Sequence, residues 1–426
     1  MTIYENPAKE SWNDIIKRPE LDNRALTEIV SNVLKDVKAN GDQAVRNYTQ
    51  RFDGVALDDM TVSEQEFKDA AAALSPELKA AIIQAADNIK TFHLHQVAQP
   101  EIVQTMPGIE CWRKSVGIEK VGLYIPGGSA PLFSTILMLG IPAKIAGCKE
   151  VVLCSPPNKE GTLHPAILFS AQLVGIDKVF KVGGVQAIGA MAYGTATIPQ
   201  VYKIFGPGNQ YVMSAKQLIQ LDGIAIDMPA GPSEVAVLAD ATANADFIAA
   251  DLLSQAEHGP DSQVLLIATS KPLLDAVRIA VERQLVLLPR KDLAAKSLEN
   301  SKLIHLPTMD EAIALSNLYA PEHLIISCEN AETIGQKITN AGSVFLGNYS
   351  PESVGDYASG TNHTLPTNGH ARAYSGVSVD SFVKKITFQR LSENGLAKIA
   401  DTVIQMAEAE GLKAHANAVR VRLGDL

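Results

Sequence analysis

The sequence contains few cysteines, and their placement excludes two classes of site. Cys111, Cys148, Cys154 and Cys328 are far apart, and no two of them form a Cys-x-x-Cys pair. A thiolate zinc site and a disulfide framework both need closely spaced or numerous cysteines, so neither is expected. Cys148 and Cys154 lie in apolar stretches, which favours inert packing for both thiols.

Long apolar runs, basic runs and targeting segments are also missing. The longest apolar stretch, 131–148, is interrupted by glycine, proline and Lys144, so it is not expected to span a membrane. The first residues include neither a basic nor an apolar segment, and we therefore expect no secretory signal and a cytoplasmic protein. A net charge of -10 without clustered lysine and arginine argues against nucleic acid and anionic membranes as partners.

Aromatic residues are scarce as well, whereas small aliphatic ones are abundant. Only 5% of the chain is aromatic while 46% is hydrophobic, which is typical of a soluble α/β protein packed with Ala, Val, Ile and Leu. A chain of 426 residues is too long for one simple core. We therefore expect two or more domains.

Apolar periodicity indicates how these domains are arranged. Helical spacing is found in the first hundred residues, at 21–40 and 76–96. From about residue 120 to 221, and again from 234 to 346, short apolar strands alternate with helical stretches. This alternation predicts an α/β fold with two Rossmann-like parallel-sheet domains. An amphipathic helix is predicted at 391–410.

Glycine-rich turns follow three strands of the first alternation, at 125–130, 182–186 and 205–209. At the carboxyl ends of parallel strands, such turns let the backbone approach a phosphate group. None of the turns matches Gly-x-Gly-x-x-Gly, and none continues into Gly-Lys-Ser/Thr. Nucleotide binding and simple tight connections are therefore both open interpretations of these turns.

The segment Ser254-Gln-Ala-Glu-His-Gly-Pro-Asp261 carries a candidate half of a metal site. Gln255 and His258 are three residues apart, so they share one face of a helix that must end at Gly259-Pro260. Amide oxygen and imidazole nitrogen both bind metal ions. The alternative is a histidine stabilised by the helix dipole beside a solvated glutamine. Three further histidines are flanked by acidic residues or glycines: His323, His363 and His415.

Six motifs, in chain order, resemble those of the histidinol dehydrogenase family. They are Gly122-Leu-Tyr-Ile-Pro-Gly-Gly-Ser129, Phe205-Gly-Pro-Gly-Asn209, Asp227-Met-Pro-Ala-Gly-Pro-Ser-Glu234, Ser254-Gln-Ala-Glu-His-Gly-Pro-Asp261, Pro321-Glu-His323 and Gly355-Asp-Tyr-Ala-Ser-Gly-Thr-Asn-His363. The resemblance extends from about residue 11 to the C-terminus. It implies a zinc- and NAD-dependent, four-electron oxidation of L-histidinol to L-histidine through bound L-histidinal, in histidine biosynthesis.

The resemblance also implies a role for individual residues. One zinc ion per subunit would be held by four residues, the last of them from the other subunit of a homodimer: Gln255, His258, Asp356 and His415. His323 would take the protons released at the two hydride transfers, and Glu322 would activate the water that attacks the aldehyde.

Substrate and cofactor contacts follow from the same resemblance. Histidinol would contact the four zinc ligands, His323 and three further residues: Ser233, His363 and Glu410. The carboxylate of Glu410 would pair with the ammonium group of the substrate. NAD would contact three residues in or beside the glycine-rich turns: Tyr124, Gln186 and Asn209.

The implied domain plan is discontinuous. An N-terminal segment, 1–20, precedes a Rossmann-like domain formed by 21–125 and 235–377. The NAD-binding domain, 126–234, is inserted into it, and the C-terminal segment, 378–426, is exchanged between the two subunits.

Three alternatives remain open from sequence. Cys148 or Cys154 could attack the aldehyde and form a thiohemiacetal. The substrate could be another small amino- or sulfo-alcohol, although the carboxylate of Glu410 suits an ammonium group and not a sulfonate. A non-catalytic metal- or nucleotide-binding protein is the third alternative.

Overall fold

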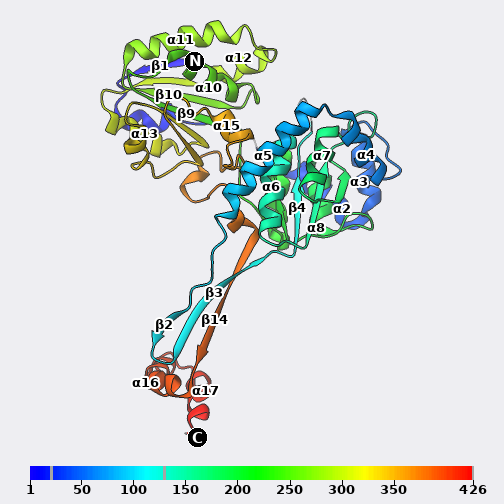
Figure 1. Cartoon of the computed structure of the whole chain (residues 1–426), viewed down its shortest axis with the longest axis vertical. Coiled ribbons are helices and arrows are strands. Elements are labelled where there is room, and N and C mark those ends of the chain that lie inside the picture. Colours follow the sequence, from blue (N-terminus) through cyan, green and yellow to red (C-terminus); the bar gives the residue numbers. More distant parts are fainter. Residues whose placement is uncertain (20–22, 128–130, 425–426) are drawn as a thin grey trace.

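The computed structural model describes residues 1–19, 23–127 and 131–424, which form two α/β bodies and one long arm. The two bodies lie beside each other, and the arm extends away from them toward the C-terminus (Figure 1). Each body has its own parallel sheet, whereas the strands of the arm are antiparallel. The predicted α/β fold with two parallel-sheet units is therefore confirmed.

The first body is built on a six-stranded parallel sheet with the order β1-β11-β10-β9-β12-β13. Its strands are β1 (Thr2–Glu5), β9 (Glu234–Ala239), β10 (Gln263–Ala268), β11 (Lys302–His305), β12 (His323–Ser327) and β13 (Ser343–Leu346). Alternate residues of β9 face opposite sides, since Val235 packs into one apolar cluster and Ala236 into another. Burial on both faces explains why these strands are continuous apolar runs.

Helices cover both faces of this sheet. One face packs against α10 (Ala245–Ala256), α11 (Lys271–Leu285) and α12 (Lys291–Glu299). The other face packs against α1 (Trp12–Ile15), α13 (Met309–Tyr319) and α14 (Ala331–Gly335). The short helix α15 (Glu352–Tyr357) follows β13 and contacts α10.

The second body is built on a five-stranded parallel sheet with the order β6-β5-β4-β7-β8. Its strands are β4 (Lys120–Tyr124), β5 (Glu150–Ser155), β6 (Lys178–Lys181), β7 (Lys203–Phe205) and β8 (Ala225–Ile226). One layer contains α2 (Asn23–Asn40), α3 (Asp42–Phe52), α8 (Gly184–Tyr193) and α9 (Gln210–Ile219). The opposite layer contains α4 (Glu64–Ala73), α6 (Phe133–Ile145) and α7 (Pro165–Leu173), with α5 (Pro76–Leu94) packed on α6.

The packing of the N-terminal helices differs from the domain plan that the resemblance implied. That plan joined residues 21–125 to 235–377. In the structure, Val30 of α2 and Ala70 of α4 are buried in the two clusters of the second sheet, and Ile89 of α5 packs with α6. These helices bury their apolar faces on the second body, because its outer helices present the matching apolar surface.

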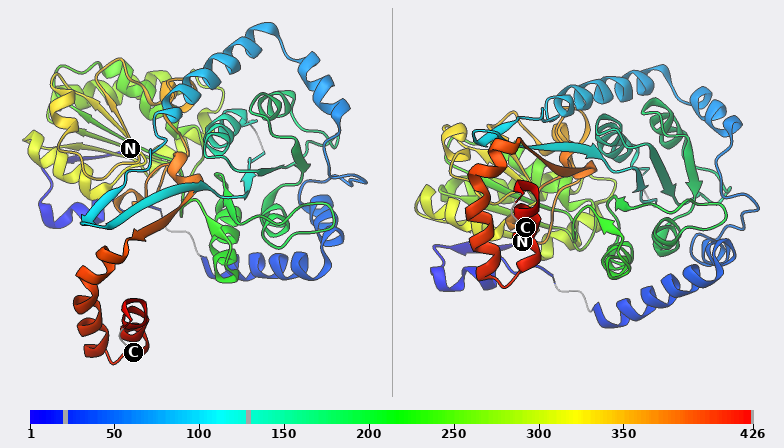
Figure 2. Two further views of the ribbon diagram at one scale, coloured as in Figure 1. Left: turned by 60° about the horizontal axis from the view of Figure 1, so that its bottom comes forward. Right: turned by 90° about the horizontal axis from the view of Figure 1, so that it is seen from below.

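The arm is a three-stranded antiparallel sheet that ends in a pair of helices. It consists of β2 (Val103–Met106), β3 (Ile109–Gly117), β14 (Val383–Leu391), α16 (Glu393–Ala409) and α17 (Lys413–Leu423). β14 pairs with β3 in unbroken register from Val383 opposite Gly117 to Leu391 opposite Ile109. Figure 2 shows that α16 and α17 pack on each other at the end of the arm, away from both sheets.

None of the helices in the described ranges is both long and apolar enough to cross a bilayer. The exclusion of the stretch 131–148 as a membrane span agrees with this result, because α6 and the turn after it are packed into the second body.

Candidate active site

The candidate site lies where the two sheets present opposite edges to each other. Glu234 is the first residue of β9 and His323 is the first residue of β12, so the first sheet contributes its amino edge. The second sheet contributes the turns after its strands, including 205–209, at its carboxyl edge. A cleft of about 970 Å³ lies between them, and its lining includes Gly206, Asn209, Ser233, His258, Glu322 and His363.

The end of α10 places Gln255 inside the site, whereas His258, predicted on the same face of this helix, lies in the turn after its last residue. Asn244 caps the helix by accepting hydrogen bonds from the backbone N–H groups of Asp246 and Phe247, and the helix ends at Ala256. Gln255 is 1% exposed, and its Nε2 donates to the carbonyl of Glu234 at 3.2 Å. Its Oε1 is buried and has no hydrogen-bond partner among the described residues.

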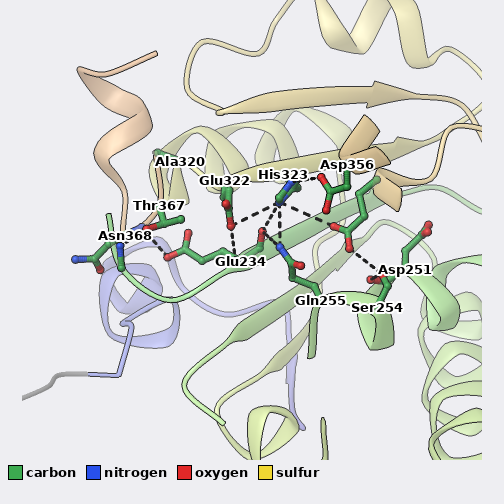
Figure 3. A network of polar contacts seen from close by, with 12 residues as sticks. Glu234, Asp251, Ser254, Gln255, Ala320, Glu322, His323, Asp356, Thr367 and Asn368 are labelled. Carbon is green, nitrogen blue, oxygen red and sulfur yellow. Dashed lines mark hydrogen bonds and ion pairs between the residues drawn. The ribbon is translucent and has the colours of Figure 1, made fainter. Parts of the chain in front are cut away.

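His323 lies at the centre of a buried polar network (Figure 3). Its Nε2 is 3.2 Å from Oδ1 of Asp356, and its Nδ1 is 3.0 Å from Nε2 of Gln255. The same Nδ1 is 3.2 Å from the carbonyl of Glu234. In the neutral ring, Nε2–H donates to Asp356 while Nδ1 accepts from Gln255; in the protonated ring, Nδ1–H donates to Glu234. The network therefore accommodates both protonation states of this imidazole.

Carboxylates surround the same ring. Oε2 of Glu322 is 3.6 Å and Oε2 of Glu352 is 4.0 Å from Nδ1 of His323. Burial alone would lower the pKa of His323, but the negative charges of Glu322, Asp356 and Glu352 outweigh burial and raise that pKa well above its usual value. The surrounding carboxylates therefore stabilise the protonated form of this imidazole.

Asp356 and His258 belong to the same electrostatic group. Burial would raise the pKa of Asp356, but the hydrogen bond from His323 and the charges of the three nearby imidazoles lower it overall. His258 is exposed at the cleft wall, and desolvation still lowers its pKa, with Asp356 acting in the opposite direction. An ionised carboxylate and a neutral imidazole are both ready to bind a cation.

His363 connects the two bodies. Its Nδ1–H donates to the carbonyl of Asp356 at 2.7 Å, so its Nε2 accepts from the hydroxyl of Thr135 on α6 at 3.0 Å. Desolvation is the main reason that the pKa of His363 is lowered. The ring is therefore held neutral, in one tautomer, at the boundary between the first and second bodies.

The residues implied for zinc fit a cation even though one chain does not complete the set. Among the described residues, no three His, Cys, Asp or Glu side chains form a ready metal site. Buried polar atoms almost always have a partner. The orphaned Oε1 of Gln255 is an acceptor that a cation would satisfy, and an amide oxygen, an imidazole and a carboxylate suit a borderline divalent ion such as zinc.

Two of the predicted site residues lie far from this cluster within the chain. Glu410 follows the last residue of α16, and His415 is on α17, both at the end of the arm. Both side chains are exposed. The structure describes a single chain, so it brings together Ser233, Gln255, His258, Glu322, His323, Asp356 and His363 but not these two.

Of the three residues expected to contact NAD, one lines the cleft and two are buried. Asn209 is exposed, lines the cleft and caps α9 by accepting from the backbone N–H groups of Tyr211 and Val212. Tyr124 and Gln186 are buried in the second body. The hydroxyl of Tyr124 accepts from the backbone N–H of Gly184 at 3.1 Å, so it fixes the glycine turn from beneath.

Sequence reasoning missed several residues that shape the site. Glu234 is buried and paired with Arg18, whose Nη2 donates to its Oε2 at 2.8 Å. Ser254 donates to Oε1 of Glu352 at 2.6 Å, and burial raises the pKa of Glu352 to about 8. Glu234 stands in one of the quoted motifs, whereas Arg18, 216 residues earlier in the chain, has no local signal that could have revealed its contact.

The two cysteines considered as nucleophiles lie in the core of the second sheet. Cys154 is 0% exposed and Cys148 is 6% exposed. Burial raises the pKa of both thiols, that of Cys148 to about 11. Neither thiol lines the cleft, so the thiohemiacetal alternative has no structural support.

Comparison with known proteins identifies relatives over the full length. The family model described as histidinol dehydrogenase matches residues 16–423. The chain is 60% identical to a histidinol dehydrogenase of Bacteroides thetaiotaomicron and 58% identical to one of Bacteroides fragilis, with all of each chain covered. A crystal structure of histidinol dehydrogenase from Elizabethkingia anophelis superposes with a TM-score of 0.98 at 56% identity, covering 100% of this chain and 98% of that one.

Proposed function

The chain belongs to the histidinol dehydrogenase family, and we propose that its cleft holds one zinc ion, histidinol and NAD between the two sheets. The protein is an NAD-dependent dehydrogenase that oxidises histidinol in histidine biosynthesis. The observation that carries the proposed site is the environment of His323, which is partnered in both its neutral and its protonated state.

Zinc would be held by Gln255, His258 and Asp356 of one subunit and by His415 of the partner subunit. The orphaned Oε1 of Gln255 supports this assignment, because this buried amide oxygen accepts no hydrogen bond from any described residue. Bound there, zinc would hold the imidazole and the amine of histidinol and orient its alcohol carbon toward the nicotinamide.

His323 and Glu322 would move the protons. As hydride leaves the alcohol carbon for the nicotinamide, His323 takes the hydroxyl proton on Nδ1, where the carbonyl of Glu234 accepts the new N–H. Glu322 lines the cleft and then removes a proton from the water that attacks the aldehyde. As the hydroxide adds, His323 returns its proton to the aldehyde oxygen and is neutral again. As the second hydride departs, His323 accepts a proton from the hydrate, and the acid is formed.

Glu322 is also held for this role by the backbone. Its Oε2 accepts from the N–H of Glu234 at 2.8 Å and lies 3.6 Å from Nδ1 of His323. The side chain therefore connects the open side of the cleft to the buried imidazole.

Substrate specificity would come from residues around the zinc ligands. Ser233 and His363 line the cleft, and the fixed tautomer of His363 presents a defined surface to the substrate. Glu410 of the partner subunit would pair with the ammonium group of histidinol. This carboxylate favours an amino-alcohol over a sulfo-alcohol.

NAD would bind along the carboxyl edge of the second sheet. Asn209 lines the cleft and would contact the dinucleotide directly. Contact with Tyr124 and Gln186 requires the turn at Gly184 to move, because both side chains are buried beneath it. The cofactor would then belong to the second body and the zinc to the first, within a cytoplasmic homodimer whose arms are exchanged.

A chelation experiment tests the proposed cofactors. We expect two NADH for each histidinol consumed, loss of turnover after treatment with a strong chelator, and recovery on addition of Zn²⁺. Full activity of the chelated, metal-free protein would contradict the zinc proposal. A panel of other small amino-alcohols and diols, measured with the same NADH readout, tests the substrate.

A further inference from the structure

A buried ion pair in the second body has no role in the chemistry described so far. Lys216 lies on α9, and Asp227 follows β8. Each side chain is 1% exposed, and the ammonium group contacts the carboxylate directly. Burying two charges has a large desolvation cost, which is offset only when hydrogen bonds satisfy the remaining donors and acceptors of the pair. The hydrogen-bond partners of this pair therefore indicate which part of the structure the pair keeps in place.

Those partners are the two backbone groups of one glycine. Nζ of Lys216 donates to the carbonyl of Gly206 at 2.8 Å, and the N–H of Gly206 donates to Oδ2 of Asp227 at 2.8 Å. Gly206 has a φ of 128°, and a Cβ there would lie 2.0 Å from the carbonyl oxygen of Tyr124. The ion pair thus fixes a backbone conformation that a side chain would exclude.

Gly206 begins the loop that we call the cofactor loop, residues 206–209. The loop follows β7, ends at Asn209, the cap of α9, and lines the cleft along its whole length. The other oxygen of Asp227, Oδ1, accepts from the N–H of Met228 at 2.8 Å. Asp227 therefore also fixes the start of the segment 227–234, which crosses to β9 and carries Ser233.

We propose that Lys216 and Asp227 are positioning residues, which hold the cofactor loop in the shape that receives the dinucleotide. This inference rests on the proposed function, in which Asn209 contacts NAD. A direct role for Lys216 as a phosphate ligand does not fit, because its ammonium group is buried and already bonded to Gly206 and Asp227. The pair acts on NAD through the loop, and it reaches the histidinol site only indirectly, through the start of the segment that carries Ser233.

The double variant Lys216→Met/Asp227→Asn tests this role without leaving a buried charge unpaired. We expect its KM for NAD to rise about tenfold or more, because Gly206 loses the ammonium donor and the charged acceptor that fix its backbone. The dissociation constant of histidinol from the zinc-loaded enzyme without NAD is expected to stay within about twofold. Lys216→Arg, which keeps the charge on a bulkier head group, is expected to give a smaller rise in the same KM.

The exposed ion pair between Lys38 and Asp222 provides a matched control. Asp222 lies just after α9, and its side chain is 41% exposed. Asp222→Asn is expected to leave the KM for NAD unchanged.

Three outcomes separate the inference from the proposed function. If Asn209→Ala leaves the KM for NAD unchanged, the proposed cofactor site is wrong. If Asn209→Ala raises it but neither variant at Lys216 does, the positioning role is wrong and the cofactor site stands. If the double variant weakens histidinol binding as much as NAD binding, the pair has a general structural role and the inference is overturned.

Discussion

The cleft and the arm carry different parts of the same proposed site, and one chain completes only the first. In the cleft, His323 and its neighbours are buried and hydrogen-bonded, so their orientation is fixed by the chain itself. On the arm, Glu410 and His415 are exposed and have no side-chain hydrogen bond or ion pair within the described ranges. The residues proposed for proton transfer are therefore preorganised within one chain, whereas the proposed zinc and ammonium sites would need a second chain to complete them.

The composition of the arm supports the same conclusion. Its sheet is exposed along β14, where Ile386 is 42% and Phe388 is 39% exposed. Met406 on α16 is 62% exposed, and Leu412, which precedes α17, is 44% exposed. A small unit with so few buried side chains has no core to stabilise it alone. Several exposed apolar side chains on one small unit are typical of a subunit interface.

The largest predicted effect is a fall in kcat when the buried imidazole of the cleft is replaced. His323→Gln keeps a side chain that can hydrogen-bond Asp356 but cannot take up a proton at Nδ1. We expect kcat to fall by a factor of about 10²–10⁴, while zinc content and the elution volume in size-exclusion chromatography stay unchanged. The measurement is steady-state NADH formation with saturating histidinol and NAD. Wild-type kcat in this variant would show that His323 is not the base.

A smaller effect is expected when the apolar surface of the arm is changed. Met406→Glu places a charge on an exposed apolar side chain of α16, which a partner subunit would have to bury. We expect the dimer dissociation constant to rise by a factor of about ten or more, and activity to fall with it at low protein concentration. Sedimentation equilibrium measures this constant. Asp401→Asn, at an exposed carboxylate on the same helix, is the control, and an equal effect of both changes would contradict the assignment of Met406 to an interface.

The smallest effect is a pH-dependent change in stability at Glu352. Burial raises its pKa from an ordinary 4.5 to about 8, so the stability that its neutral form contributes is full below about pH 4.5 and is lost as pH rises through about 8. In the metal-free protein, Glu352→Gln removes this loss of stability at high pH, because an amide does not ionise. We expect the Tm of the variant, relative to wild type, to be about 2–5 °C higher at pH 9 than at pH 5.

Thermal unfolding followed by circular dichroism at the two pH values measures this change. Glu332→Gln, at an exposed carboxylate on α14, is the control and is expected to show no such difference. A Tm difference for Glu352→Gln that is the same at both pH values would show that Glu352 is ionised in the folded protein.

Local pattern predicted the elements that hold the site. The end of the helix just after Gln255 followed from spacing and from the glycine and proline that come next in the chain. The helices predicted at 21–40 and 76–96 are confirmed as α2 and α5; α5 ends two residues earlier than predicted, and residues 21 and 22 lie outside the described residues. Short-range periodicity is enough for these features because burial of one face dictates them.

Contacts between distant residues could not be predicted in the same way. The pairing of Arg18 with Glu234 and of Thr135 with His363 depends on how the two bodies meet. The strands β3 and β14 were missed because β14 is exposed over most of its length and β3 is mostly half-buried, and neither shows a clear apolar alternation. The roles of Glu410 and His415 came only from the family resemblance.

Mixing of two inactive variants tests the shared site most directly. His323→Gln chains and His415→Asn chains are each expected to be inactive as homodimers. When the two are co-expressed in equal amounts, half of the dimers should be mixed, and one of the two sites in each mixed dimer should contain both native histidines. We therefore predict recovery of about a quarter of wild-type activity. No recovery, with mixed dimers demonstrated by native mass spectrometry, would contradict the exchange of His415 between subunits.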